Sequence, residues 1–343
     1  MTAPTSSPVA IFDGHNDLLY HLREEGDLLG NSFISGRNGA LDAQKCRRGG
    51  FAGGFFAIWP KGRPKTEGDR TAPIDESDAR VSTLEMAAIL LRMTRARPDV
   101  IRLCTSAAQI EAARADGAIA AIMHIEGVEG IGPDLGELEV LHAAGLRSIG
   151  PVWSRPNIFA HGVPFAFPST PDIGPGLTEA GMRLIAECER LGILIDLSHL
   201  NEKGFWDVAR ISSRPLVATH SSVHAISAQS RNLTDKQLGA IAESGGLVGV
   251  NFGCQFLRAD GERRSDTSVD VIVQHLAHLV DRLGEGGVAL GSDFDGALMP
   301  DEVTTAEGLP LLVEAMRRAG FGQTLIERIC WQNWIDVLRR TIG

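Results

Sequence analysis

Eight short apolar runs recur along the chain and constrain its fold more than any other feature. Each run is rich in Val, Ile, Leu, Ala and Gly and lacks the polar alternation of a half-exposed strand. Such runs are typical of parallel strands that are covered on both faces. They lie at residues 9–14, 50–59, 118–127, 147–153, 192–199, 215–220, 246–253 and 287–296.

Helical patterns separate most of these runs. The clearest ones span 75–98, 177–192 and 267–284, and two more are expected between 302 and 341. Eight strands that alternate with helices predict an α/β protein with a (β/α)8 TIM-like barrel. A doubly wound open sheet is the alternative, but no G-x-G-x-x-G motif marks a strand–helix turn.

The length of the chain does not decide between one domain and two, but the strand count favours one. A chain of 343 residues suits either two small domains or one large barrel. We expect a single barrel domain over residues 1–343. Two polar or irregular segments, 60–76 and 154–176, each follow a strand and are expected to be long active-site loops on the top face of the barrel.

Composition excludes several classes of function. A formal net charge of -10 argues against a general nucleic-acid binder, which needs a basic face. No apolar run approaches the roughly 18 residues that a membrane span needs, and the first residues lack the features of a signal peptide. Five scattered cysteines fit neither a disulfide framework nor a zinc finger. We therefore expect a cytoplasmic protein with no nucleic-acid or membrane partner.

Side chains that can bind a metal or move a proton follow five of the eight apolar runs. In a parallel barrel the ends of all strands meet on one face, which is where barrel enzymes carry their chemistry. Each such residue alone is more often structural, but six at equivalent positions indicate a metal site. They are His15, Asp17, Glu126, His199, His220 and Asp293.

This residue set predicts a hydrolytic centre with two metal ions. His15 and Asp17 are two apart, so an alternating strand would direct both to one side, where they could hold one ion. His199 and His220 would hold the other ion. Glu126 lies on the strand between the two groups, and its carboxylate could bridge the ions. Asp293 would then face the bridging water and accept its proton.

The motifs that contain these residues resemble those of the membrane (renal) dipeptidase family of zinc peptidases, in order and spacing. They are DGHND (13–17), IEGVEG (125–130), DLSH (196–199), THSS (219–222), SRN (230–232) and DFDG (293–296). The resemblance extends from about residue 9 to about residue 340. It implies a (β/α)8 barrel with a binuclear zinc site, and it suggests a bacterial-type cytoplasmic relative and a homodimer.

Carried over residue by residue, the resemblance agrees with the assignment from strand ends. It implies that His15 and Asp17 bind the first zinc, that Glu126 bridges, and that the two histidines of the later strands bind the second zinc. Asp293 matches the family's acid/base carboxylate. Arg231 matches the arginine that holds the substrate's C-terminal carboxylate, which suits the planar fork of a guanidinium.

The chain departs from the family at one position of the predicted site. The mammalian enzymes carry a histidine just after the fourth strand, thought to contact the oxygen of the scissile group, and the best match here is Trp153. Tryptophan donates only through its indole N–H. Stabilisation of the oxyanion would then come from a zinc ion or from another donor on the following loop, such as His161.

These observations predict a metal-dependent dipeptidase. Two Zn²⁺ ions, or other divalent metals, would activate a water that attacks the peptide carbon of a small dipeptide, with L-Xaa-D-Xaa substrates implied by the resemblance. A related amidohydrolase acting on N-acyl amino acids, lactones or phosphoesters is the alternative, since the same metal centre would serve it. A barrel that binds metal without catalysis is a third hypothesis, but no expected ligand is missing.

Overall fold

The computed structural model describes residues 8–69 and 71–343, and its strands form one parallel sheet. Eight of the strands follow the order β6-β5-β4-β2-β1-β9-β8-β7, and a parallel bridge between Asp196 and Val217 joins the two ends of this path. The predicted (β/α)8 barrel is therefore confirmed. The strands are β1 (Ile11–Asn16), β2 (Phe51–Ile58), β3 (Ile101–Leu103), β4 (Ile119–Glu126), β5 (Leu146–Gly150), β6 (Leu194–Ile195), β7 (Val217–Ala218), β8 (Leu247–Val250) and β9 (Val288–Leu290).

Each of the eight predicted apolar runs overlaps one barrel strand, and β3 is an additional strand that the sequence did not indicate. β3 pairs with residues 119–121 of β4, and β5 pairs with residues 123–126 of the same strand. β2 occupies the other edge of β4. β3 therefore lies beside the first half of β4, outside the barrel path, and its three residues are too few to give a periodic signal.

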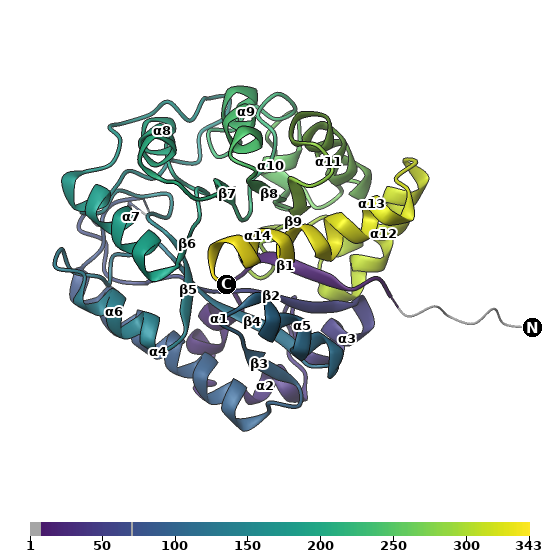
Figure 1. The fold of residues 1–343 in the computed structure, drawn as a ribbon, viewed down its shortest axis with the longest axis horizontal. Helices are drawn as coiled ribbons and strands as arrows, with labels where there is room; N and C mark the ends of the chain where they lie inside the picture. The colour runs from purple at the N-terminus through teal and green to yellow at the C-terminus, as the bar shows by residue number, and fades with distance from the viewer. Residues whose placement is uncertain (1–7, 70) are drawn as a thin grey trace, which may run out of the picture.

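Helices surround the strands in a ring (Figure 1). The α-helices are α1 (Leu18–Glu24), α2 (Asn31–Ser35), α3 (Ala43–Gly49), α4 (Glu76–Ala96), α5 (Ala107–Ala115), α6 (Gly136–Ala143), α7 (Glu179–Leu191), α8 (Glu202–Ile211), α9 (Asp235–Glu243), α10 (Cys254–Leu257), α11 (Val269–Leu283), α12 (Leu309–Arg318), α13 (Gln323–Glu327) and α14 (Asn333–Thr341). Short turns η1 (Asp301–Val303) and η2 (Ala306–Gly308) and the π-helical η3 (Arg328–Gln332) complete the chain.

The predicted helix boundaries at 177–192 follow from capping. The hydroxyl of Thr178 accepts a hydrogen bond from the backbone N–H of Gly181 at the start of α7, and Gly192 ends the helix with a φ of 70°. The predicted helices at 75–98 and 267–284 correspond to α4 and α11. None of the helices in the described ranges is long and apolar enough to cross a membrane.

The C-terminal helix closes the end of the barrel opposite the strands' carboxyl ends. Trp331 and Trp334 pack with Phe12 and Phe55 in the barrel interior, and the indole N–H of Trp334 donates to the Leu290 carbonyl at 2.9 Å. Figure 1 shows α14 lying across the strands at this end. The helix therefore acts as an apolar plug, and the chemistry must lie at the other end.

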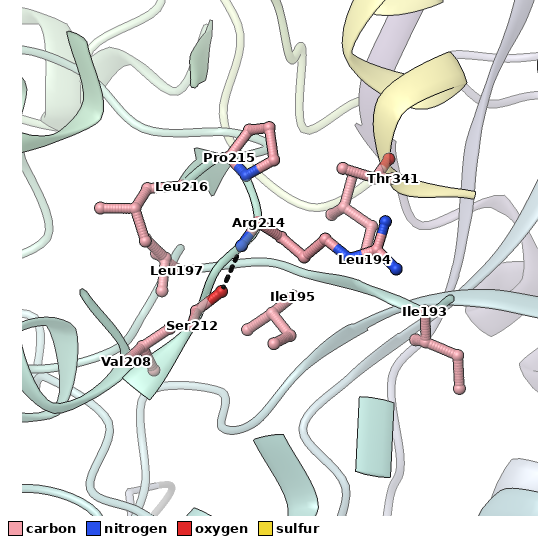
Figure 2. Close-up of a pocket in the computed structure, with 10 residues that line it drawn as sticks. All are labelled: Ile193, Leu194, Ile195, Leu197, Val208, Ser212, Arg214, Pro215, Leu216 and Thr341. Atoms are coloured by element: carbon pink, nitrogen blue, oxygen red, sulfur yellow. Dashed lines mark hydrogen bonds between the residues drawn. The ribbon is translucent and has the colours of Figure 1, made fainter. Parts of the chain in front are cut away.

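A small hollow remains beside this plug (Figure 2). Arg214 extends from the segment before β7 towards Thr341 and donates to the backbone carbonyl of Arg340 at 3.1 Å. The other residues that line the hollow are mostly aliphatic, including Ile193, Ile195 and Leu216. It contains no cluster of titratable side chains, so it is a packing defect between α14 and β6 and not a reactive site.

His275 is a buried structural histidine whose neutral form the fold requires. Its Nδ1 accepts the backbone N–H of Val223 at 3.0 Å, and its Nε2–H donates to the Leu257 carbonyl at 2.9 Å. One nitrogen must accept while the other donates, so protonation would break a bond. Burial lowers the pKa of His275 from 6.5 to about 4.

We therefore expect His275 to make stability depend on pH. Its folded-state pKa is depressed, so its contribution is fully present above about pH 6.5 and is lost as the pH falls towards 4. Between about pH 7.5 and about pH 5 the loss should be about 2 kcal/mol. In His275→Gln the amide can accept from Val223 and donate to Leu257. Urea unfolding of both proteins at both pH values should show a smaller pH effect in the variant; an equal effect contradicts the assignment.

Candidate active site

A cavity of about 420 Å³ opens at the carboxyl ends of the strands, between the two long loops. The loop over 60–76 contributes Thr71 to its wall, and the segment from β5 into the loop over 154–176 contributes Trp153 and Phe165. Residues of both segments therefore line this cavity. The cavity is lined by Asp17, Tyr20, Trp59, Thr71, Glu126, Trp153, Phe165, His199, Gln255, Phe256, Arg263, Asp293, Asp295, Gly296 and Ala297.

Glu126 lies at the centre of a cluster of imidazoles at the floor of this cavity. Its Oε1 is 2.9 Å from the Nε2 of His199, 3.1 Å from the Nε2 of His220 and 3.8 Å from the Nε2 of His15. The Nε2 atoms of His199 and His220 are 3.1 Å apart. The first, third, fifth and sixth predicted strands thus bring these four side chains together, as their positions at strand ends predict.

A second group adjoins the first through His15. The Nε2 of His15 is 3.4 Å from the Oδ2 of Asp17, and ligand atoms of His15, Asp17 and Asp293 lie within 4.8 Å of one another. All six residues predicted from strand ends therefore converge. His15 belongs to both groups and connects them.

The local backbone at the end of β1 is less regular than simple alternation predicts. β1 ends at Asn16, and its ladder with β2 has an irregularity between Asp13 and Asn16. Asp17 is already the N-terminal cap position of α1. The two side chains therefore converge across a strand-to-helix transition and not along one face of an uninterrupted strand.

A hydrogen-bond chain fixes the orientation of His220. The Thr219 hydroxyl lies 2.6 Å from the Oδ2 of Asp196 and 2.8 Å from the Nδ1 of His220. A carboxylate only accepts, so the hydroxyl donates to Asp196 and accepts from the Nδ1–H of His220. The Nε2 of His220 then carries a lone pair that faces Glu126. Asp196 is itself fixed, since its Oδ1 accepts the backbone N–H of Thr219 at 2.8 Å.

His199 is held by a second hydroxyl and by an unusual backbone conformation. Its Nδ1 is 2.7 Å from the Oγ of Ser154, which leaves Nε2 directed at Glu126. The φ of His199 is 66°, a left-handed conformation that is costly for a residue with a side chain. His199 lies four residues beyond a very short strand, since β6 spans only Leu194–Ile195.

Asp293 is positioned by its backbone and by an amide. Its φ is 66°, its N–H donates to the His15 carbonyl at 3.0 Å, and its Oδ2 accepts from the Nδ2 of Asn251 at 2.9 Å. Gly296 leaves the space for this arrangement. A Cβ at that position would lie 2.1 Å from the Oδ2 of Asp17 and 2.2 Å from the Oδ1 of Asp293.

Burial shifts the pKa values of the side chains in the cluster away from their ordinary values. Burial raises the pKa of Glu126 to about 8 and the pKa of Asp293 to about 7. Burial also lowers the pKa values of His199 and His220 well below 6.5, so both rings are neutral at pH 7. Burial opposes the charge of His15 too, but the nearby carboxylates, Glu126 foremost, outweigh it and raise its pKa to about 10.

Arg231 lies beside the cluster and keeps free donors. Its two terminal nitrogens donate to the Ser221 hydroxyl at 2.7 Å and to the His220 carbonyl at 2.9 Å. Its Nε is buried without a partner among the described residues. Arg231 is absent from the cavity wall itself, so any anion it binds must reach past the residues that line the cavity.

Trp153 and His161 were singled out because the chain departs from the family's motifs there, and the structure places them differently. Trp153 lines the cavity, and its ring is 6.0 Å from that of His199. His161 does not line the cavity; its carbonyl accepts the N–H of Asn201 at 3.2 Å, and its ring faces Gly174. The structure therefore brings Trp153, but not His161, to the cluster.

Sequence reasoning missed several residues that orient the cluster. Asn251 directly follows β8, so the rule that selected the other strand-end residues would have found it. Asp196 and Thr219 stand within the DLSH and THSS motifs, next to residues that were selected. Ser154 carries no comparable signal, because its role depends on where the chain turns after β5.

A parallel barrel with buried histidines and carboxylates at the carboxyl ends of its strands belongs to the class of metal-dependent hydrolases. The sequence model described as "Membrane dipeptidase (Peptidase family M19)" matches residues 5–342. The chain therefore belongs to the membrane dipeptidase family, as its motifs indicate, and it is a metallopeptidase with dipeptidase activity.

Similar proteins agree over nearly the whole chain. A solved structure of the dipeptidase AC is 49% identical, with a TM-score of 0.94, and the match covers 98% of this chain and 100% of that one. A metallopeptidase from Rhodobacter sphaeroides, solved with a phosphinate mimic of L-Ala-D-Ala, is 48% identical, with a TM-score of 0.92 and coverage of 97% and 99%. An uncharacterised protein from Klebsiella pneumoniae is 49% identical over 74% of this chain and 94% of its own length.

Proposed function

We propose that this dipeptidase cleaves its substrates at a binuclear metal centre, with two Zn²⁺ as the resident ions and L-Xaa-D-Xaa dipeptides among its substrates. The convergence of three imidazole nitrogens on one oxygen of Glu126 carries this proposal. The Rhodobacter sphaeroides relative, which was solved with a mimic of an L-D dipeptide, supports the stereochemical part.

The donor set fits a pair of divalent cations. Both ring nitrogens of His15 are buried without a hydrogen-bond partner among the described residues. The Nε2 atoms of His199 and His220 lie 3.1 Å apart, and each lies within 3.1 Å of the Oε1 of Glu126, so the three atoms could share a cation. Unsatisfied buried nitrogens are costly in a protein interior, and a cation would satisfy them. Imidazole and carboxylate together suit zinc, although other divalent metals accept the same ligands.

In this proposal each residue has one task. His15 and Asp17 would hold one ion, His199 and His220 would hold the other, and Glu126 would offer its carboxylate to both. When bound, two such ions lower the pKa of a water shared between them and stabilise negative charge on a carbonyl oxygen.

Proton transfer is the task of Asp293. Its carboxylate accepts the proton of the attacking water and then delivers it to the leaving amine. Asn251 keeps Oδ2 oriented during both transfers.

Substrate binding in this proposal uses Arg231 and the cavity. The free N–H groups of Arg231 would hold the C-terminal carboxylate of the dipeptide, since a guanidinium pairs a carboxylate at two points. Trp153 forms part of the wall. We assign no substrate contact to His161, because its ring faces Gly174 and not the cluster. The homodimer and the cytoplasmic location that the resemblance implies stay predictions.

The first experiment is a substrate panel. Zinc-loaded protein is assayed on L-L dipeptides, L-D dipeptides and N-acyl amino acids, and its metal content is measured by mass spectrometry. The proposal expects cleavage of dipeptides and two equivalents of metal. Turnover of N-acyl amino acids, lactones or phosphoesters without dipeptide cleavage would keep the metal centre and overturn the substrate assignment.

We also expect Thr219→Val to weaken metal binding while the fold is kept. Valine matches threonine in shape but cannot relay the hydrogen bond from His220 to Asp196, so the ring loses its fixed tautomer. Loss of such an outer contact typically costs about 10- to 100-fold in metal affinity. Competition with a chromophoric chelator measures this directly.

Thr94→Val is the matched control for that substitution. Thr94 is also buried, but its hydroxyl donates to the Leu90 carbonyl within α4, away from the cluster. Its metal affinity should equal that of the wild type. Equal affinities in the two variants would show that the hydroxyl of Thr219 does not orient a ligand.

A further inference from the structure

Five aromatic rings form an unbroken arc along the cavity wall. Their successive centroid distances are 5.2 Å, 5.3 Å, 5.5 Å and 5.9 Å, and neighbouring rings are mostly edge to face. The arc comes from the segments that follow four different strands, β1, β2, β5 and β8, and its members all line the cavity. In order, the rings belong to Tyr20, Trp59, Trp153, Phe165 and Phe256.

One ring of the arc offers exposed apolar surface to a ligand. Phe165 is 45% exposed although it contacts the rings of Trp153 and Phe256. A large apolar side chain exposed at the mouth of a cavity is a common feature of ligand sites. Phe165 therefore presents apolar surface to a ligand in the cavity.

Arg155 contacts the two tryptophans of the arc. Its guanidinium carbon is 5.4 Å from the ring centroid of Trp59 and 5.1 Å from that of Trp153. Its Nε donates to Glu129 at 2.6 Å, and a terminal nitrogen donates to the Pro60 carbonyl at 2.7 Å. Arg155 thereby ties together the loops that follow β2, β4 and β5.

The ion pair between Arg155 and Glu129 positions the surrounding loops and adds little to the stability of the fold. Arg155 and Glu129 are each only 3% exposed at the side chain. A buried pair costs desolvation that its attraction barely repays, so it adds little to the free energy of folding. What it provides is a fixed distance between three loops, and that distance sets the two tryptophans against each other.

Charge decides what the arc can bind. Aromatic faces attract cations, but four of the five rings already have one nearby. Lys61 lies 5.2 Å from the ring of Tyr20, Arg155 serves both tryptophans, and Arg231 lies 6.0 Å from the ring of Phe256. A second cation would be repelled by the first, so the free faces favour an uncharged ligand.

We propose that the aromatic arc is a subsite for a large, uncharged, apolar side chain of the dipeptide, and that Arg155 is the positioning residue that sets its shape. This inference rests on the proposed dipeptidase function and deepens it by naming the substrate class. Dipeptides with Leu, Met or Phe at one of their two positions are the expected substrates, ahead of those with Gly, Ala or Lys.

The test compares kcat and KM across dipeptides that vary one position at a time, X-Ala and Ala-X, with X as Ala, Leu, Phe or Lys and with both stereoisomers of the second residue. The wild type should favour Leu or Phe over Ala and Lys at one position by at least about 10-fold in kcat/KM. Hydrolysis of Ala-Ala reports on the dipeptidase function itself. Its presence without any apolar preference would overturn this inference alone, whereas no cleavage of any dipeptide would overturn the function.

Two variants distinguish the role of Trp153, which lines the cavity, from the role of Arg155, which positions it. Trp153→Ala should lower kcat/KM for the Leu and Phe substrates by about 10- to 100-fold and for Ala-Ala by only about 3-fold or less. Arg155→Met, which keeps apolar volume against the tryptophans, should raise KM for the same bulky substrates and leave kcat nearly unchanged. A uniform fall in kcat for all substrates would indicate a general structural role and contradict positioning.

Arg114→Met is the matched control. Arg114 also lies over a tryptophan, 4.4 Å from the ring centroid of Trp331, but at the closed end of the barrel. Its substrate preference should match that of the wild type. If Arg155→Met does not fold, the double variant Arg155→Met/Glu129→Leu removes both buried charges, and the same shift in preference is expected. A preference for Lys over Leu would replace the apolar ligand by a cationic one and overturn the proposal.

Discussion

Asp293→Asn is expected to abolish dipeptide hydrolysis while the protein keeps its metals. Asparagine has nearly the shape of aspartate and can still accept the hydrogen bond from Asn251 through its amide oxygen. It cannot accept and return a proton. General acid–base catalysis contributes on the order of 10²- to 10⁴-fold, so kcat should fall by that factor.

The measurement pairs kcat on a good dipeptide substrate with metal content. Asp301→Asn is the control, since Asp301 is an exposed residue further along the same connection, outside the cavity. It should leave both quantities unchanged. Retention of more than about a tenth of kcat in Asp293→Asn would assign the proton transfer to another group. Loss of metal together with activity would make Asp293 a ligand and not the acid/base residue.

The barrel could be predicted from the sequence because burial on both faces leaves a simple signal. Strands such as β2 and β4 are almost entirely buried, so their sequences are continuous apolar runs. β6 and β7 have only two residues each in regular pairing. The residues that flank them are buried as well, and they lengthen the apolar runs that predict these strands. β3 has no such support, because two of its three residues are only partly buried.

The cluster could be predicted because topology alone brings strand ends together. His15, Glu126, His199 and His220 need no more than their place at the end of a parallel strand. The contacts of the residues that orient these four side chains depend on the conformation of individual turns, which the topology does not determine. Whether Ser154 reaches His199 is set by the turn after β5, which no local pattern specifies.

The aromatic arc was beyond prediction for a related reason. Its rings come from separate loops, and their contacts depend on how those loops pack against one another. Arg155 has no sequence pattern that distinguishes it from a surface arginine. Its burial, its contact with Glu129 and its two aromatic neighbours become visible only when the three loops are placed.

Glu126→Gln is expected to cost the protein metal as well as activity. The Oε1 of Glu126 lies within 3.1 Å of the Nε2 atoms of both His199 and His220. A carboxylate can bridge two cations because it offers two anionic oxygens, whereas a neutral amide offers one weak donor oxygen. We expect metal content to fall from two equivalents to one or none, and kcat/KM to fall at least about 10³-fold.

Glu129→Gln separates a bridging role from the general effect of losing a buried carboxylate. Glu129 lies three residues further along, is equally buried and is bound by Arg155 instead of facing the imidazoles. Its variant should retain both metals, whatever happens to its substrate preference. Metal content is compared after dialysis against the same weak chelator. Two equivalents retained in Glu126→Gln would refute the bridge, since the remaining ligands would then suffice, and equal losses in both variants would attribute the effect to packing.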